Sequence, residues 1–281
     1  MSDAVVTDAV VTNAVATGAF APTADELMGN HAGSIRDLGI VTAADGDTLV
    51  ADIEVRPELC FPGTDVVCTS VLVTLADVVA GKFANVSTFP RVCVTLDLDL
   101  HLLAVPSGAG FEAGRSLTAR SCVVRAGQRI VVMGVELFDA DGRLFAVGNA
   151  GFMASPNPAH EVSDGFPLDT SEERCHLDEP FADRVGLRRT GNGSATVPFH
   201  LDNINATGAI QGGLLALVAE EALADLTRSA PIESMSLRYL RGFRGSAAHA
   251  TARIDGRLGR AEVVDDEGRT GTLVTVRFAP A

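Results

Sequence analysis

The sequence predicts an α+β fold in which one arrangement of elements occurs twice. A hairpin, a long apolar helix and several alternating strands follow one another in the first half, and the same order returns after residue 179. The period is roughly 140 residues, which is typical of a tandem duplication rather than a solenoid. A long apolar helix combined with antiparallel strands indicates that each copy lays its helix on a sheet.

The chain divides into four segments. Residues 1–22 contain the near-repeat DAVVT-DAVVT-NAVAT, which has neither helical nor strand periodicity and predicts a mobile N-terminal tail. The first copy occupies residues 23–154 and the second occupies residues 180–281. Between them, residues 155–179 are rich in Pro, Ser and acidic side chains, and this composition predicts a linker.

The first copy is expected to begin with a short helix at 24–33, capped by Thr23. The segment 39–55 has Ala-Asp-Gly-Asp at its centre between alternating apolar residues, which predicts a hairpin. An apolar helix is expected at 70–82. The remaining strands are expected at 91–105, 116–125, 130–138 and 144–153.

The second copy repeats this order in a shorter form. Residues 185–201 contain a Thr-Gly-Asn-Gly sequence that predicts a hairpin turn. A second apolar helix, over 213–226, follows directly on Gln211 and Gly212. Strands are expected at 235–240, 249–257 and 270–278.

The two apolar helices share an acidic position but differ where they begin. Superposing them places Asp77 on Glu220 and Thr69 on Gly212. The first N–H groups of a helix have no intrahelical partner and attract negative charge, and a glycine lets a ligand oxygen approach them. We therefore expect an oxyanion site at the start of the second helix and none at the start of the first.

Composition restricts the classes of partner. The formal net charge of −14 argues against a general nucleic-acid or anionic-membrane binder, because both need a basic surface. The five cysteines are odd in number and lack CxxC spacing, and the histidines lack metal-ligand spacing, so neither a disulfide framework nor a metal is indicated. The N-terminus has no basic signal region, and no apolar run is expected to reach the length of a membrane span, which makes a cytoplasmic protein the default.

The ordered motifs resemble the hot-dog fold acyl-CoA thioesterases of the PaaI-like and 4-hydroxybenzoyl-CoA type. That family has an Asn, a His-Gly-Gly helix entry, a Leu-Ala-Asp or Leu-Ala-Glu on the central helix, and a strand that reads Tyr-Leu-Arg-Pro. The matching residues are Leu75-Ala76-Asp77, Asn205, Gln211-Gly212-Gly213, Glu220, Tyr239-Leu240-Arg241 and the turns Gly142-Arg143-Leu144 and Gly268-Arg269. The resemblance covers about 30–153 and 180–279, and it implies a double hot-dog unit.

Three departures from the family pattern bear on the site. Gln211 stands where histidine is usual, and Gly242 replaces the proline of the strand motif. In the first copy, Cys68-Thr69-Ser70 replaces His-Gly-Gly. The first copy alone should therefore be unable to form an oxyanion site.

The resemblance also implies where catalysis would occur. In the family, the oxyanion glycine and the carboxylate meet across the interface between two protomers, so a tandem chain would hold two pseudo-equivalent sites. One would combine Asp77 with Asn205, Gln211 and Gly212. The other would combine Glu220 with Pro62, Cys68 and Thr69. Only the first is complete, and its carboxylate would activate water or attack the thioester carbonyl while the Gly212 N–H stabilises the oxyanion.

Substrate binding would involve coenzyme A as part of the substrate, with no other cofactor. Arginines are candidates for its phosphates, although exposed strand arginines paired with acids fit the pattern equally well. The candidate substrate-binding residues are Gly213, Arg241, Arg125, Arg129, Arg257 and Arg260. Exposed sheet edges favour a homodimer of double hot-dog units.

Alternatives remain for both the residues and the activity. Asp77 could belong to a solvated helix face, since Ser70 and Thr74 lie on the same side of the helix. The chain could be a catalytically silent acyl-CoA-binding protein, given the altered His-Gly-Gly entry. It could also be a degenerate dehydratase or hydratase, because Cys60-Phe61-Pro62-Gly63 is similar to the His-Phe-Pro-Gly of acyl-carrier dehydratases.

Overall fold

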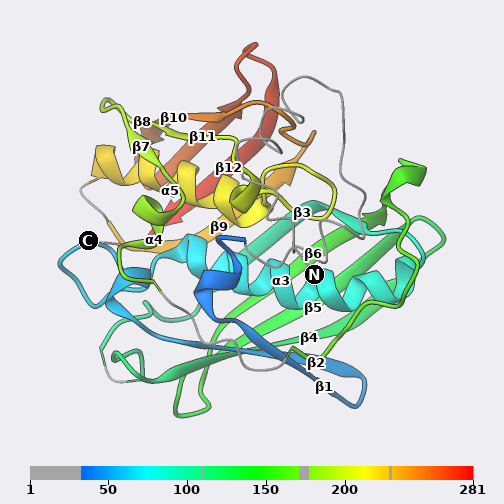
Figure 1. Cartoon of the computed structure of the whole chain (residues 1–281). Coiled ribbons are helices and arrows are strands. Elements are labelled where there is room, and N and C mark those ends of the chain that lie inside the picture. The colour runs from blue at the N-terminus through cyan, green and yellow to red at the C-terminus, as the bar shows by residue number, and fades with distance from the viewer. Residues whose placement is uncertain (1–32, 109, 171–176, 228–229, 281) are drawn as a thin grey trace, which may run out of the picture.

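The computed structural model describes residues 33–108, 110–170, 177–227 and 230–280 (Figure 1). The expected tail at 1–22 and nearly all of the expected helix at 24–33 lie outside these residues. The strands of the first copy are β1 (Val41–Asp45), β2 (Thr48–Glu54), β3 (Cys93–Leu102), β4 (Ser116–Ala126), β5 (Ile130–Phe138) and β6 (Leu144–Ala154). Those of the second copy are β7 (Arg188–Arg189), β8 (Ser194–Val197), β9 (Ile232–Tyr239), β10 (Ala248–Asp255), β11 (Leu258–Val264) and β12 (Thr270–Phe278).

Within the described residues, these twelve strands form one antiparallel sheet in the order β1-β2-β4-β5-β6-β3-β9-β12-β11-β10-β8-β7. The second half of this order mirrors the first, and the copies join where β3 pairs with β9. At that junction Leu98 stands opposite Leu237, and Arg238 forms an ion pair with Asp99 at 3.2 Å. The two copies therefore share one continuous sheet rather than packing as separate beads.

Two long helices lie on the same face of the sheet (Figure 1). They are α3 (Thr69–Thr88) and α5 (Gly212–Thr227), and they pack against each other near their N-termini. A Cβ on Gly213 would lie 2.1 Å from the Thr74 hydroxyl oxygen, so this close approach requires glycine. The predicted α+β architecture, with both helices facing a common interface, is confirmed.

One hydrophobic core runs between the helices and the sheet. It contains Leu72 and Leu75 from α3, Leu215 from α5 and Leu237 from β9, all buried. The short helices at the edges of this core are η1 (Arg36–Leu38), η2 (Pro57–Leu59), η3 (Pro158–His160), α4 (Phe181–Arg184) and η4 (Leu201–Asn203). Because residues of both copies belong to the same core, neither copy is expected to fold without the other.

The helix α3 extends beyond its predicted range of 70–82. Asn85 Oδ1 accepts the backbone N–H of Cys93 at 2.7 Å, which ties the last turns of the helix to β3. The expectation that no apolar run reaches a membrane-spanning length is wrong for this helix, which is 20 residues long and contains an 18-residue window with a mean hydropathy of 1.3. That window is 67% buried inside the protein, as in the core helix of a folded domain, so it is weak evidence for a membrane span.

The late turns of the two copies have the same geometry. In the first, Asp139 Oδ1 accepts the N–H of Arg143 at 2.9 Å while Oδ2 accepts from the Arg143 guanidinium at 3.0 Å. In the second, Asp265 makes the same two contacts with Arg269, at 2.9 and 2.8 Å. By contrast, the sequence after the strand expected at 249–257 predicts only a turn, and β11 is an additional strand there.

The described part of the segment between the copies packs along the edge of the sheet. The N–H of Thr170 donates to the carbonyl of Thr42 in β1, and the N–H of Ala44 donates to Asp169 Oδ1, both at 2.9 Å. Unpaired strand edges invite further pairing, and this segment satisfies the edge of β1. It also brings Leu168 and Asp169 close to the C-terminal half of α3.

Candidate active site

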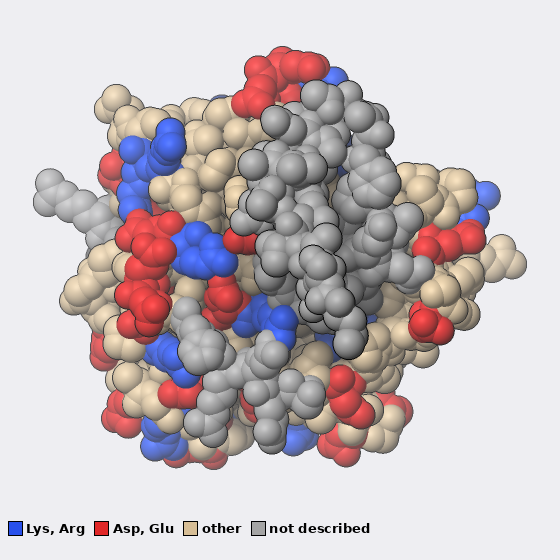
Figure 2. Space-filling model, in the orientation of Figure 1, with Lys and Arg blue, Asp and Glu red and all other residues tan. Residues whose placement is uncertain are grey.

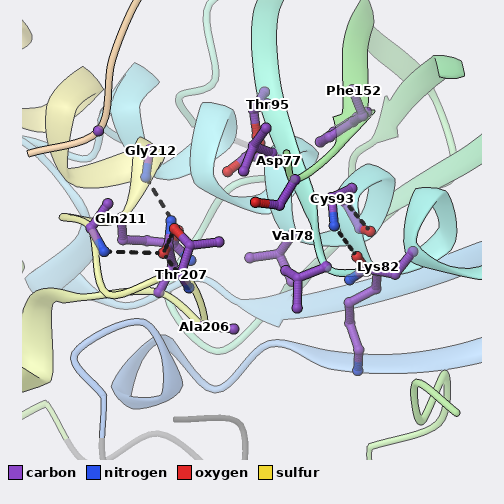
Figure 3. Close-up of a pocket in the computed structure, with 18 of the residues that line it drawn as sticks. Asp77, Val78, Lys82, Cys93, Thr95, Phe152, Ala206, Thr207, Gln211 and Gly212 are labelled. Atoms are coloured by element: carbon purple, nitrogen blue, oxygen red, sulfur yellow. Dashed lines mark hydrogen bonds between the residues drawn. The ribbon is translucent and has the colours of Figure 1, made fainter. Parts of the chain in front are cut away.

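A cavity of about 1150 Å³ lies between α3, β3, the start of α5 and the segment that follows β6. Both copies line it (Figure 3). Five of the sequence-predicted site residues reach this cavity: Asp77, Asn205, Gln211, Gly212 and Arg241. The cavity therefore brings together the carboxylate of the first copy and the glycine helix entry of the second, as predicted for the complete site.

Asp77 is buried on α3, with an exposed fraction of 9%. The hydroxyl of Thr95 donates to its Oδ1 at 2.9 Å. Burial raises the pKa of Asp77 to about 6, and the hydrogen bond from Thr95 offsets part of that effect. The interpretation of Asp77 as part of a solvated helix face is therefore wrong, and its pKa suits a base that works near neutral pH.

Gly212 begins α5 directly opposite Asp77. A Cβ at this position would lie 3.2 Å from Asp77 Oδ2 and 3.2 Å from the hydroxyl oxygen of Tyr239. The Tyr239 hydroxyl donates to the carbonyl oxygen of Gly212 at 3.2 Å, which fixes the first peptide unit of the helix. The N–H of Gly212 donates to Gln211 Oε1 at 3.2 Å rather than to Asp77, so the side chain of Gln211 occupies the acceptor position on this N–H.

Asn205 shapes the loop that leads into α5. Its Oδ1 accepts the backbone N–H of Thr207 at 2.9 Å and the Thr207 hydroxyl at 2.7 Å. Gly208 completes this turn with a φ of 71°, a left-handed conformation that favours glycine. Asn205 therefore positions the helix entry, and its side-chain oxygen is already committed to the loop.

The pseudo-equivalent site around Glu220 is closed. Thr69 N–H donates to Glu220 Oε1 at 2.8 Å, and Ser70 N–H donates to Oε2 at 2.9 Å. Burial raises the pKa of Glu220 to about 7, and these backbone hydrogen bonds partly oppose the shift. The carboxylate thus caps the N-terminus of α3 itself, occupies both of these N–H groups and does not line the cavity.

The predicted substrate-binding residues separate into two groups. Arg241 lines the cavity beside Arg244, whose Nε donates to the carbonyl of Thr207 at 3.1 Å. Gly213 packs against α3 instead of facing the cavity. Arg125, Arg129, Arg257 and Arg260 also lie away from it. Arg257, for example, forms an ion pair with Glu233 at 2.6 Å, as the alternative of paired surface arginines anticipated.

Two residues for which the sequence predicts no function contact the site. Thr95 contacts Asp77, and Tyr239 contacts Gly212. In the sequence of 91–105, Val92, Val94 and Leu96 alternate with other residues, so strict alternation predicts that Thr95 lies on the opposite face. A register shift between Thr95 and Asp97 breaks that alternation, and Thr95 also reaches the cavity. Tyr239 belongs to the Tyr-Leu-Arg motif but carried no predicted function, because its phenol could not be placed opposite the helix entry from sequence.

The described residues contain no group of three or more His, Cys, Asp or Glu side chains placed to hold a metal ion. Charge on the face shown in Figure 2 is mixed, with acidic and basic side chains interspersed. At the cavity, a buried carboxylate faces a helix N-terminus.

The fold matches solved structures of the hot-dog type. A 12:0-ACP thioesterase from Umbellularia californica superposes with a TM-score of 0.60 at 11% identity, over 85% of this chain and 100% of that one. An acyl-ACP thioesterase from Bacteroides thetaiotaomicron gives 0.57 at 14% identity, over 83% and 98%. A hot-dog fold protein from Alicyclobacillus acidocaldarius gives 0.53 at 13% identity, over 88% and 99%. No family model and no curated protein matches the chain. The predicted double hot-dog fold is confirmed.

Proposed function

We propose that this double hot-dog protein hydrolyses an acyl thioester of coenzyme A at a single site shared by its two copies. One observation carries the proposal: Asp77 Oδ2 lies 3.2 Å from where a Gly212 Cβ would stand, within a cavity of about 1150 Å³. The carboxylate and the helix N-terminus are thus close enough to act on one carbonyl group. Solved thioesterases with the same fold support this type of reaction.

The carbonyl oxygen of the substrate would replace Gln211 Oε1 on the Gly212 N–H. A preorganised N–H at a helix N-terminus stabilises the developing oxyanion, and such a donor contributes about 3–4 kcal/mol in comparable sites. Asp77 would then take a proton from water, or attack the carbonyl carbon itself. The C–S bond breaks, the proton is delivered to the departing thiolate, and water supplies the hydroxyl of the product acid.

Tyr239 is a positioning residue in this scheme. Its hydroxyl donates to the Gly212 carbonyl, so it acts on the orientation of the first peptide units of α5. Burial raises the pKa of Tyr239 well above its ordinary value, and the nearby Asp77 adds to the shift. The phenol therefore stays protonated and serves as a fixed donor, not as a proton-transfer group.

A thiol-release assay tests the proposal. The purified chain is given a panel of acyl-CoAs of increasing chain length at pH 8, above the pKa of Asp77, and the same acyl groups on acyl carrier protein form a second arm. Release of thiol from acyl-CoA that disappears in Asp77→Asn supports the proposal. Thiol release only from the carrier-protein thioesters would mean that the protein hydrolyses thioesters, but that acyl carrier protein rather than coenzyme A carries the acyl group.

One observation favours a second candidate, a binding protein without turnover. Because Gln211 Oε1 already accepts the Gly212 N–H, a substrate must displace it. Calorimetric binding of an acyl-CoA without thiol release would establish that alternative. No comparable observation favours a dehydratase, since the thiol of Cys60 is buried, donates to the carbonyl of Arg56 at 3.5 Å and does not line the cavity.

A further inference from the structure

Lys82 is the only lysine in the 281-residue chain, and it lines the same cavity as Asp77. It lies on α3 five residues after Asp77 and is half-buried. Figure 3 shows its side chain at the other end of the close-up from Gly212 and Gln211, with Val78 between them. The thioester chemistry proposed above does not use this cation.

The Lys82 ammonium group is held by neutral oxygens. Its Nζ donates to the Thr42 hydroxyl at 2.7 Å and to the carbonyl of Leu168 at 3.4 Å. Among the described residues it has no ion pair with a carboxylate. The carboxylate of Asp169 lies beyond ion-pair distance and favours the protonated form of Lys82 by its charge. Oδ1 of Asp169 accepts the N–H of Ala44. A lysine has three donors, so this ammonium can take a further acceptor.

Partial burial makes the positive charge of Lys82 energetically unfavourable unless a further acceptor is present. The lining of the cavity that Lys82 reaches also includes apolar side chains, namely Val78, Val92, Val94, Leu96, Phe152 and Met153. Burial lowers the pKa of Lys82 to about 8, with Asp169 opposing the shift. A purely structural role, joining α3 to the sheet edge, would need only a neutral donor. A half-buried cation that has no ion pair among the described residues fits an anionic ligand group better.

We propose that Lys82 binds a carboxylate at the far end of the acyl group, so that the substrate is a thioester of a dicarboxylic acid. This inference rests on the proposed thioesterase function. Five residues of helix separate Lys82 from Asp77 by about 7.5 Å along the axis, which suits an acyl chain of several carbons. The phosphates of coenzyme A would have other cations, Arg241 and Arg244, which also line the cavity; Arg241 is ion-paired with Asp265 at 3.5 Å.

The test compares two acyl groups of equal carbon number, one with a terminal methyl and one with a terminal carboxylate. Each is supplied as the coenzyme A thioester and as the N-acetylcysteamine thioester, which has no phosphates. Wild type should prefer the carboxylated acyl group on both carriers. Lys82→Met should lower the ratio of the two kcat/KM values roughly 30-fold or more, as expected for truncating one member of a hydrogen-bonded charge pair. Lys82→Arg should retain most of the preference.

Val78→Thr is the matched control, because it alters the same wall without altering its charge. It should change the kcat/KM values of both acyl groups by the same factor. Lys82→Gln keeps a donor for Thr42 and Leu168, and thermal unfolding of each variant shows whether the fold survives. An unchanged ratio in folded Lys82→Gln or Lys82→Met would overturn the proposal.

Binding measurements separate this inference from the proposed hydrolysis. Calorimetry with non-hydrolysable thioether analogues of the same compounds reports the terminal subsite even if no thioester is cleaved. Weaker binding of the carboxylated analogue alone, in Lys82→Met, supports the subsite. Weaker binding of both coenzyme A analogues, with the N-acetylcysteamine analogues unaffected, would assign Lys82 to the phosphates and overturn it.

Discussion

The N-termini of α3 and α5 occupy equivalent positions in the two copies, and each faces a carboxylate from the other copy's helix. At α5, the short side chain of Asp77 stops beside Gly212 without accepting its N–H. At α3, Glu220 accepts the N–H groups of both Thr69 and Ser70. One additional methylene lets the glutamate reach the backbone, and this closes the second site.

This difference shows how equivalent positions in the two copies of a duplicated fold can take different roles. A carboxylate bonded to two N–H groups at a helix start is a favourable cap, because those donors otherwise lack partners. Burial raises the pKa of both carboxylates, but Asp77 is not bonded to the helix start and remains available for chemistry. The Glu220 side therefore stabilises the interface between the copies, and the Asp77 side is left open to a ligand.

The largest expected effect is on turnover. Asp77→Asn keeps the volume but removes the charge needed to activate water or attack the carbonyl, so kcat should fall about 100-fold or more. Glu220→Gln should lower kcat less than about 5-fold, because Glu220 does not reach the cavity. Steady-state kinetics of both variants on one acyl-CoA measure this, and KM should change less than kcat. The opposite ranking would move catalysis to Glu220, and small, equal effects would favour the binding protein.

The pH profile should follow Asp77. Its pKa is raised to about 6 by burial, and the carboxylate form is the active one. Activity should therefore be full above pH 7 and decline as the pH falls through about 6, by about tenfold for each further unit. Measuring kcat/KM from pH 4.5 to 8.5 checks this. A profile that is flat through pH 6 would contradict a role for the ionised carboxylate.

Substitutions of the two adjacent glycines of α5 should affect different properties, catalysis at Gly212 and stability at Gly213. A methyl group at Gly212 would lie 3.2 Å from Asp77 Oδ2, so Gly212→Ala should lower kcat/KM about tenfold or more with little loss of stability. A methyl group at Gly213 would overlap Thr74, and Gly213→Ala should destabilise the fold by about 1–3 kcal/mol. Kinetics and urea unfolding of both variants make the comparison. Equal losses of stability would mean that Gly212 has only a packing role.

The smallest effect is expected at the closed site. Thr69→Gly copies the glycine entry, but Glu220 still occupies both N–H groups, so activity should change less than about 2-fold. Adding Glu220→Asp shortens the carboxylate and should release those N–H groups. Residual turnover of Asp77→Asn, measured with and without these two changes, reveals any second active site. A gain with Thr69→Gly alone would show that Glu220 does not close it.

Much of the fold could be predicted because its signals are local. The hairpin centred on Gly46, the glycine entry of α5 and the repeated order of elements follow from turn chemistry and hydrophobic period. The range of α3 was underestimated, since its last turns are tied down by Asn85 and Cys93 rather than by helix signals. The strand β11 was missed because its weak alternation includes Gly259, which packs closely against Leu223.

The sequence by itself determined the duplication, the acidic position on each helix and the unequal entries at Thr69 and Gly212, since each is a pattern of residue types along one segment. Only the tertiary structure decided that Asp77 is buried, that Thr95 turns inward and that Glu220 caps α3. Those outcomes depend on distances between segments far apart in the chain. At such contacts the reach of a single methylene, or a shift in strand register, determines whether a carboxylate is a cap or a candidate catalyst.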